Sequence, residues 1–207
     1  MGDPSRFWNK MAERYARQPI GDEAAYQHKL KTTQRYFHPE MVLMEFGCGT
    51  GSTAITHAPL VKHVRATDFS EAMIAIAQDK AVAAGVSNID FEVAAIDTMP
   101  VVPEAYDMVL GLSILHLLED RDAALNKVFA MLKPGGLFVS STVCIGDTMA
   151  FFKLVGPIGK AMGLLPHLDV MTKVDLIESQ HRAGFMIEEE YQPGKGKAVF
   201  LVARKPG

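Results

Sequence analysis

Residues 42–52 read Val-Leu-Met-Glu-Phe-Gly-Cys-Gly-Thr-Gly-Ser, and this stretch decides the fold. The apolar run over residues 41–46 predicts a buried strand. Three glycines follow at alternate positions, and without a Cβ they let the backbone turn sharply and approach a ligand closely. A helix that begins at Ser52 would direct its N-terminal amides at the same ligand. The stretch predicts a strand, glycine loop and helix that bind a nucleotide; the alternative is a plain tight turn.

The glycine spacing distinguishes two nucleotide-binding families. A dinucleotide fingerprint reads Gly-x-Gly-x-x-Gly, but here the sixth position is Ser52 and the third glycine comes one place early. Glu45 adds an acid at the end of the predicted strand. The pattern Glu-x-Gly-x-Gly-x-Gly, from Glu45 to Gly51, resembles motif I of the class I S-adenosylmethionine-dependent methyltransferases. The resemblance implies S-adenosylmethionine as the cofactor, with this loop around its methionine part, which carries no phosphate.

Length and composition predict a single cytoplasmic domain. The chain has 207 residues, 48% of them hydrophobic, which suits one buried core. A formal net charge of −3 without a Lys/Arg cluster predicts no nucleic-acid partner. Cys48 and Cys144 have neither metal-type nor redox spacing, so we expect no metal site and no structural disulfide. The N-terminus lacks the apolar core of a signal peptide, and no apolar run reaches the ~20 residues of a membrane span, so we expect no stable membrane insertion.

The first forty residues predict two helices outside the sheet. One interpretation is a pair of surface helices whose apolar stripes pack on the core. The other is a lid, because Trp8, Ala12 and Tyr15 resemble the N-terminal Tyr/Trp…Ala…Tyr segment of many small methyltransferases, whose tyrosine closes over the cofactor. We therefore divide the single domain into a helical lid, residues 1–40, and a cofactor-binding part, residues 41–207. The two stripes are Phe7, Trp8, Met11, Tyr15 and Tyr26, Leu30, Thr33, Phe37.

A second strand over residues 63–67 ends at Asp68. Asp68 follows Gly47 by 21 residues, close to the offset of about 20 residues at which an acid meets a ribose hydroxyl pair in such folds. A carboxylate suits this role because it accepts two hydrogen bonds side by side. The alternative is an acid at the start of the next helix, residues 71–84, which Ser70 would cap.

A third strand, residues 89–94, leads into Ala-Ile-Asp-Thr-Met-Pro at residues 95–100. The corresponding methyltransferase loop reads roughly Gly-Asp-Ala-Glu-x-Leu-Pro and holds the adenine. Alignment on the proline places Ile96 and Asp97 at the adenine-contacting positions. Ala95 stands where the family often has aspartate, and Asp97 could equally be a solvated loop acid.

A fourth strand, residues 106–112, is followed by Ser-Ile-Leu-His-Leu-Leu. The segment resembles the family pattern Phe-Asp-x-Val-x-x-x-x-x-Leu-His-His, in which His116 matches the first histidine and Leu117 replaces the second. One interpretation of His116 is a satisfied core histidine. The other is a catalytic base, because open α/β sheets bind ligands just past the carboxyl ends of their strands.

A helix over residues 120–132 leads to Lys-Pro-Gly-Gly at residues 133–136. These four residues predict a break before a fifth strand at residues 137–143. The sequence Leu-Lys-Pro-Gly-Gly-x-Phe, which ends at Phe138, resembles a late motif of the same family, where its role is architectural.

Residues 144–171 combine many Met, Phe and Leu side chains with interspersed glycines. One interpretation is a core helix and a loop. The other is an insertion over the active-site edge of the sheet, where its side chains would cover an apolar acceptor. Thr172 and Asp175 predict a capping box for a helix that reaches residue 183. Two further strands, at residues 185–191 and 198–204, flank Pro-Gly-Lys-Gly at residues 193–196 and predict a C-terminal hairpin.

These elements predict an α/β fold: a doubly wound, seven-stranded, mostly parallel sheet with a C-terminal antiparallel hairpin, as in Rossmann-like methyltransferases. The resemblance implies methyl transfer from S-adenosylmethionine to a small, apolar acceptor by in-line displacement, in the quinone-biosynthesis-like branch, with His116 as the candidate base. The alternatives are a non-catalytic S-adenosylmethionine-binding protein and an NAD(P)-dependent oxidoreductase. We expect a monomer or homodimer. The implied cofactor-binding residues are Tyr15, Glu45, Gly47, Cys48, Gly49, Gly51, Asp68, Phe69, Met73, Ile96, Asp97, Gly111 and Leu112.

Overall fold

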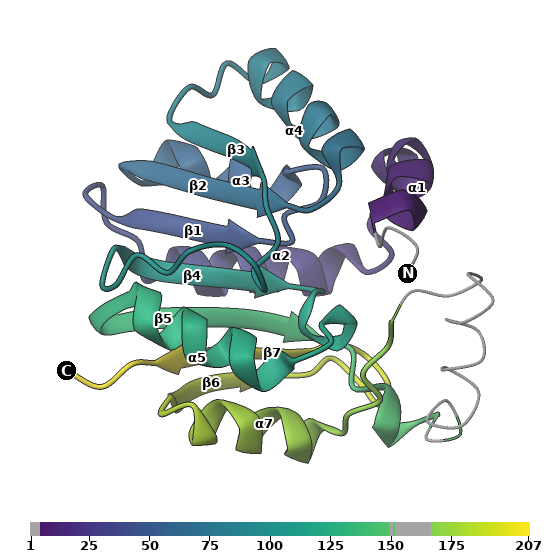
Figure 1. The fold of residues 1–207 in the computed structure, drawn as a ribbon, viewed down its shortest axis with the longest axis vertical. Coiled ribbons are helices and arrows are strands. Elements are labelled where there is room, and N and C mark those ends of the chain that lie inside the picture. The colour runs from purple at the N-terminus through teal and green to yellow at the C-terminus, as the bar shows by residue number, and fades with distance from the viewer. Residues whose placement is uncertain (1–4, 150, 152–166) are drawn as a thin grey trace. The chain divides into compact units, whose positions relative to one another are not determined.

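The computed structural model describes residues 5–149, 151 and 167–207 (Figure 1). Within these residues, seven strands form one mixed sheet in the order β3-β2-β1-β4-β5-β7-β6, which ends in the antiparallel β6–β7 hairpin. The predicted α/β fold, mostly parallel with a C-terminal hairpin, is therefore confirmed. The chain divides into two compact units, Met1–Met99 and Pro100–Gly207, which we describe in turn.

The first unit alternates strands with helices and keeps its three strands parallel. β2 pairs with β1 on one side and β3 on the other, with Phe46 opposite Thr67 and Asp68 opposite Val93. The carboxyl ends of these strands therefore lie at one edge, where open α/β sheets bind ligands. The elements are α1 (Ser5–Arg17), α2 (Glu23–Gln34), β1 (Val42–Phe46), α3 (Ser52–His57), η1 (Ala58–Leu60), β2 (His63–Asp68), α4 (Glu71–Ala83) and β3 (Ile89–Val93).

The second unit begins with two parallel strands and ends with two antiparallel ones. β5 pairs in parallel with β4 and antiparallel with β7, so it joins the two patterns. The elements are β4 (Tyr106–Leu112), η2 (Leu115–Leu117), α5 (Arg121–Met131), β5 (Leu132–Thr142), η3 (Ile145–Asp147), α7 (Lys173–Arg182), β6 (Met186–Tyr191) and β7 (Val199–Arg204).

β5 begins at Leu132, before the Lys-Pro-Gly-Gly segment, so the predicted start at residue 137 was wrong. Leu132 pairs with Tyr106, and the register with β4 shifts just after this pair. Lys133 Nζ donates to Asp107 Oδ1 at 2.7 Å, which holds the segment against β4. A Cβ on Gly136 would lie 2.8 Å from the carbonyl oxygen of Lys133. The glycine pair thus forms an irregularity inside the strand, as at a β-bulge, and does not end it.

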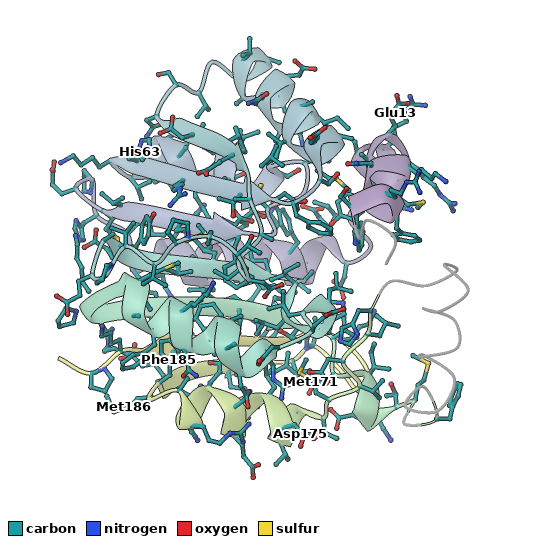
Figure 2. All side chains as sticks on the ribbon, viewed as in Figure 1. Glu13, His63, Met171, Asp175, Phe185 and Met186 are labelled. Carbon is teal, nitrogen blue, oxygen red and sulfur yellow. The ribbon has the colours of Figure 1, made fainter. Side chains whose placement is uncertain are left out.

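The core of the second unit joins α5 and α7 to the sheet. The Phe185 ring contacts those of Phe129 in α5 and Phe138 in β5, with centroids 5.2 and 5.6 Å apart (Figure 2). Gln180 of α7 is fully buried and donates through Nε2 to Ser140 Oγ of β5 at 3.0 Å. Aromatic packing and the buried Gln180–Ser140 hydrogen bond therefore hold α7 on the sheet.

Capping side chains set the helix ends. Thr172 and Asp175 form the predicted capping box of α7, and Ser70 Oγ accepts from the Met73 amide at 3.2 Å to cap α4. Asp120, which we had predicted inside α5, lies just before it and accepts from the Ala123 amide at 2.9 Å. The other predicted boundaries shift mostly by a single residue.

Two predictions concern segments expected to cover the bound cofactor and the acceptor. Segment 144–171 lies largely outside the described residues, as do residues 1–4, so its role as a cover and the lid role of residues 1–40 stay predictions. In the described ranges, no helix combines the length and the apolar character needed to traverse a bilayer.

His57 is a buried polar residue at the end of α3, and only 1% of it is exposed. Its Nδ1 lies 3.4 Å from Gln34 Nε2, and its ring packs edge-on against Phe37 at 4.9 Å. Phe37 lies past α2, which ends at Gln34, so the predicted helical stripe is wrong at its last residue. Burial lowers the pKa of His57 to about 4, so the folded protein keeps this ring neutral.

We expect His57 to destabilise the protein in mild acid. An unfolded histidine titrates near pH 6.5, and a folded pKa near 4 means that the unfolded chain binds the extra proton between these values. Stability that is present above pH 6.5 is therefore lost as the pH falls, by about 2 kcal/mol at pH 5 relative to pH 8. Urea unfolding of the wild type and of His57→Gln measures this, because the variant lacks the titrating ring. If the difference in unfolding free energy between the wild type and His57→Gln stayed constant from pH 8 to pH 5, the prediction would be contradicted.

Candidate functional site

Two buried carboxylates lie at the carboxyl ends of β1 and β2 in the first unit. Glu45 is 3% exposed and Asp68 is 7% exposed. Asp68 Oδ2 accepts from the Gly49 amide at 2.9 Å, and its Oδ1 accepts from the Ser70 amide at 2.9 Å. Glu45 Oε2 is buried without a hydrogen-bond partner among the described residues. The parallel register of the two strands thus places an unpaired acceptor and a fixed carboxylate beside the glycine loop.

The two acids are held in an unfavourable electrostatic state. Burial raises the pKa of Glu45 to about 8, and the nearby Asp68 charge adds to this rise. Burial also raises the pKa of Asp68, against the lowering effect of the main-chain amides of Ser70, Gly49 and Phe69. A positively charged group placed beside the acids would offset the cost of burying their negative charges and the repulsion between them.

The glycine loop takes left-handed backbone angles at three positions: φ is 64° at Gly47, 53° at Gly49 and 72° at Gly51. A Cβ on Gly51 would lie 2.8 Å from the Phe91 ring, so packing excludes a side chain there. A Cβ on Gly49 would meet only Tyr15, at 3.7 Å. Gly51 is therefore required by the core, whereas Gly49 presents open backbone beside Tyr15.

Lys80 of α4 is hydrogen-bonded to the C-terminal part of this loop and to the start of α3. Its Nζ donates to the Thr50 carbonyl oxygen at 3.0 Å and to Ser52 Oγ at 2.6 Å. Our sequence reasoning missed this residue. The available signal was a lysine in register with the inward-facing Met73 and Ala77, where an unpaired cation would be costly.

α1 lies against the same part of the first unit. Asn9 Oδ1 accepts from Ser70 Oγ at 2.6 Å and from the Ala72 amide at 3.3 Å, so α1 is bonded to the start of α4. Burial and the charges of Asp68 and Glu45 raise the pKa of the Tyr15 hydroxyl. The predicted cofactor-binding Tyr15 is thus brought to the glycine loop, although the residue is 46% exposed.

The other candidate residues of the first unit differ in burial. Met73 and Ile96 are buried, Phe69 is half-buried, and Asp97 is exposed. Asp97 therefore has the solvation of an ordinary loop acid, one of its two predicted interpretations. Cys48 is a buried free thiol, and its amide donates to the Thr67 carbonyl oxygen at 2.9 Å, which ties the loop to β2.

Gly111, Leu112 and His116 belong to the second unit, at the end of β4 and in η2. His116 Nδ1 is buried and has no hydrogen-bond partner in the described part of the chain. Burial lowers the pKa of His116, against the opposing charge of Asp169. The ring is therefore neutral near pH 7 and could accept a proton.

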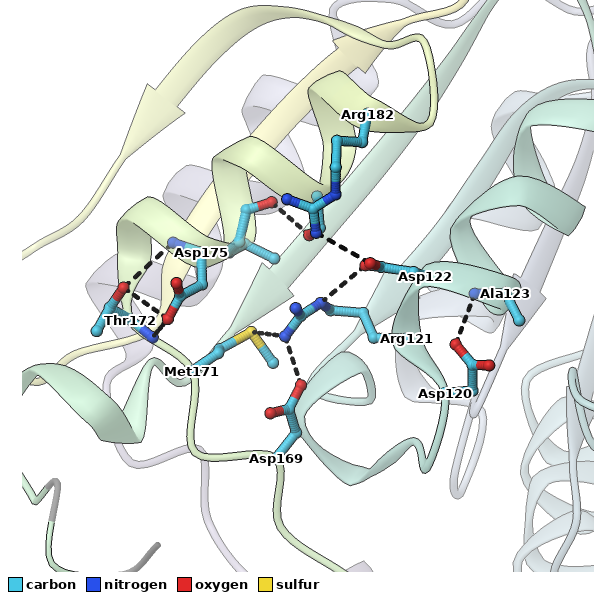
Figure 3. Close-up of polar contacts among 11 residues, drawn as sticks. Asp120, Arg121, Asp122, Ala123, Asp169, Met171, Thr172, Asp175 and Arg182 are labelled. Carbon is cyan, nitrogen blue, oxygen red and sulfur yellow. Dashed lines mark hydrogen bonds and ion pairs between the residues drawn. The ribbon is translucent and has the colours of Figure 1, made fainter.

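An arginine network joins the start of α5 to Asp169 and Met171 and to the end of α7 (Figure 3). Arg121 Nη1 contacts the Asp169 carboxylate and lies 3.1 Å from Met171 Sδ. The Asp169 amide donates to the His116 carbonyl oxygen at 2.8 Å. Asp122 beside Arg121 accepts from Arg182 Nη2 at 2.9 Å. Sequence reasoning missed this network because its partners are far apart in the chain. Arg121 and Asp169 are separated by 48 positions, and Asp122 and Arg182 by 60.

Part of the chain is similar in sequence to known methyltransferases. Residues 43–136 match the family described as a methyltransferase domain. A ubiquinone biosynthesis O-methyltransferase from Pseudomonas savastanoi pv. phaseolicola is 31% identical over 114 residues, 55% of this chain and 49% of that protein. The chain thus matches about half the length of such curated relatives.

Two solved structures share the fold. A putative S-adenosylmethionine-dependent methyltransferase from Listeria monocytogenes has a TM-score of 0.71 at 21% identity, covering 91% of this chain and 100% of that one. The cyclase SpnF has a TM-score of 0.76 at 19% identity, covering 91% of this chain and 83% of that one. Proteins with this fold therefore include one named for a reaction other than methyl transfer.

Proposed function

We infer that the chain belongs to the class I S-adenosylmethionine-dependent methyltransferases and that its cofactor is S-adenosylmethionine; the methyltransferase-domain match, the O-methyltransferase relatives and the shared fold support this. We propose that it transfers the methyl group of this cofactor to a small, apolar acceptor. The observation that carries the proposal is the pair of buried carboxylates, Glu45 and Asp68, beside the glycine loop, with Asp68 bonded to the amide of the open Gly49.

The residues of the first unit fit this cofactor chemically. S-adenosylmethionine carries a sulfonium and an ammonium cation, and Glu45 offers a buried oxygen that has no hydrogen-bond partner among the described residues. A cation near Glu45 would offset the cost that raises the pKa of this acid to about 8. Asp68 accepts two hydrogen bonds at 2.9 Å, and a carboxylate can accept about four, so it keeps capacity for ribose hydroxyls.

We assign the remaining candidates by their chemistry. The backbone of Gly47, Cys48 and Gly49 would hold the methionine part, and the buried Ile96 side chain would contact the adenine. Further contacts are proposed for Tyr15, Gly51, Phe69, Met73, Asp97, Gly111 and Leu112.

When bound, the cofactor supplies an electrophilic methyl group, so the protein has mainly to align a nucleophile with it. His116 is the proposed base for an acceptor that loses a proton. Its low pKa keeps the imidazole in the neutral form that can take up this proton. Oxygen and carbon acids would use such a base, whereas an amine or thiol acceptor could react without it.

One experiment separates this proposal from its alternatives. The purified protein is incubated with S-adenosylmethionine labelled in the methyl group and with a set of phenols, quinols and amines. Transfer of label to an apolar phenol or quinol supports the proposal. Tight binding without transfer would indicate a cofactor-binding protein, and calorimetry that shows NAD binding but no response to S-adenosylhomocysteine would indicate an oxidoreductase.

Asp68→Ala should weaken S-adenosylhomocysteine binding by roughly 1–3 kcal/mol, because it removes charge-assisted hydrogen bonds. Isothermal titration calorimetry measures the loss. Asp90→Ala is the matched control. It removes one negative charge from the same unit, as Asp68→Ala does, but at an exposed position on the neighbouring β3. An unchanged dissociation constant for Asp68→Ala would assign Asp68 only to the start of α4.

A further inference from the structure

α1 concentrates positive charge on one side of the first unit. Its four cations follow at spacings of four, four and three residues, so they form one stripe along the helix. All four are exposed, and within α1 the only acid is Glu13, which pairs with Arg17 at 2.9 Å. The cations are Arg6, Lys10, Arg14 and Arg17. This local excess contrasts with the net charge of −3 for the whole chain.

Aromatic side chains lie beside this stripe. Phe7 and Trp8 make an edge-to-face contact at 5.3 Å, and both stay only half-buried, as does Met11. Asn9 and Ala12 face the rest of the first unit instead, Asn9 through its bonds to α4 and Ala12 by being 1% exposed. The helix therefore has a contact side, an aromatic side and a cationic side.

A surface depression follows the cationic side. It has a volume of about 620 Å³ and is lined, among the described residues, by Lys10, Glu13, Arg14 and Arg17 together with uncharged neighbours. Three cations against one acid favour an anionic group in this depression. Figure 2 shows Glu13 on the outer side of α1.

We propose that α1 is an interfacial helix that docks the protein on an anionic lipid bilayer. Basic residues beside Trp and Phe are typical of helices that lie in the headgroup region. A nucleic-acid duplex would use the cations but would leave the half-buried aromatic side without a role, because its bases are already stacked, and the chain as a whole is acidic.

Docking through α1 would bring the cofactor loop close to the bilayer. Asn9 is bonded to Ser70 beside Asp68, and Tyr15 of the same helix lies next to Gly49. An apolar acceptor dissolves in lipid, so a site near the surface shortens its path to the reacting group. The docking of α1 on lipid does not depend on the proposed methyl transfer. Only the shorter path of the acceptor rests on that proposed function.

Trp8 gives a direct readout, because it is the single tryptophan of the chain and lies in α1. The protein is titrated with phosphatidylglycerol vesicles, with neutral phosphatidylcholine vesicles and with transfer RNA, without cofactor or acceptor. We expect a blue shift of Trp8 emission, and quenching by brominated lipid, only with the anionic vesicles. No vesicle binding, equal binding to neutral vesicles, or preferred binding of RNA would each overturn the proposal.

A pair of matched variants tests the cationic stripe. In the triple variant Arg6→Gln, Lys10→Gln, Arg14→Gln, vesicle affinity should fall on the order of 100-fold. The control removes the same charge from exposed positions outside α1, and its affinity should change much less. Both should retain the affinity of the wild type for S-adenosylhomocysteine. Equal losses in the two variants would overturn the role of α1. The control substitutions are Lys31→Gln, Arg35→Gln and Lys62→Gln.

Discussion

A Gly49→Val protein is expected to remain folded and to lose more than about 100-fold in S-adenosylhomocysteine affinity, or ~2.7 kcal/mol. Gly49 has a φ of 53°. A Cβ added to it would have only the Tyr15 ring nearby, at 3.7 Å. The fold therefore has room for a side chain, although the left-handed angle costs roughly 1–2 kcal/mol for any L residue. A valine would fill the space in which the ligand meets the loop backbone, and calorimetry measures the loss.

The control for this variant is Gly85→Val. Gly85 has a φ of 67° and nothing within 4 Å of a Cβ, so it carries similar backbone strain in the same unit but lies after α4. Both variants should melt at similarly reduced temperatures, and only Gly49→Val should lose binding. Equal affinities of the two variants would contradict the contact between ligand and Gly49 backbone.

The sequence predicted the order of the elements because each local signal agreed with the next. The apolar run before Gly47 became the buried β1, and α4 ended within one residue of its predicted end, just before Gly85 with a φ of 67°. The start of β5 could not be predicted in this way. Pro and Gly there suggested a break, but the Leu132–Tyr106 pair and the Lys133–Asp107 bond keep the strand together from outside the segment. Tertiary pairing overrode the local turn signal.

The site was predictable where parallel strands alone bring residues together. Asp68 ends β2 and Glu45 is the penultimate residue of β1, so their proximity to the glycine loop follows from topology. Lys80 and Asn9 were not predictable in the same sense. Both reach their partners through side chains, across 28 and 61 positions of sequence, and such contacts leave only the weak signal of a polar residue on an inward face.

The pH dependence of ligand binding should identify Glu45 as the acid that meets the ligand's positive charge. In the free protein the pKa of Glu45 is about 8, raised by burial and by Asp68, so the acid is mostly protonated at pH 6. If the cationic ligand binds the ionised form, affinity rises roughly 50-fold from pH 6 to pH 8 and binding at pH 6 releases close to one proton. The raised pKa of Glu45 affects folding in the opposite direction, because the folded state favours the protonated acid. The stability of the free protein therefore falls as the pH rises from the pKa of Glu45 in the unfolded chain through 8.

Calorimetry in two buffers with different ionisation enthalpies counts the released protons. Glu45→Gln keeps the shape of the side chain but cannot ionise, so its affinity should lack this rise and its binding should release almost no proton at pH 6. Glu40→Gln, a change at an exposed acid just before β1, should behave as the wild type does. The ligand's own amino group also titrates near pH 8, but it does so equally in all three proteins, so the comparison cancels it. If Glu45→Gln retained the slope and the proton release of the wild type, the buried oxygen of Glu45 would have to be assigned to the fold and not to the ligand.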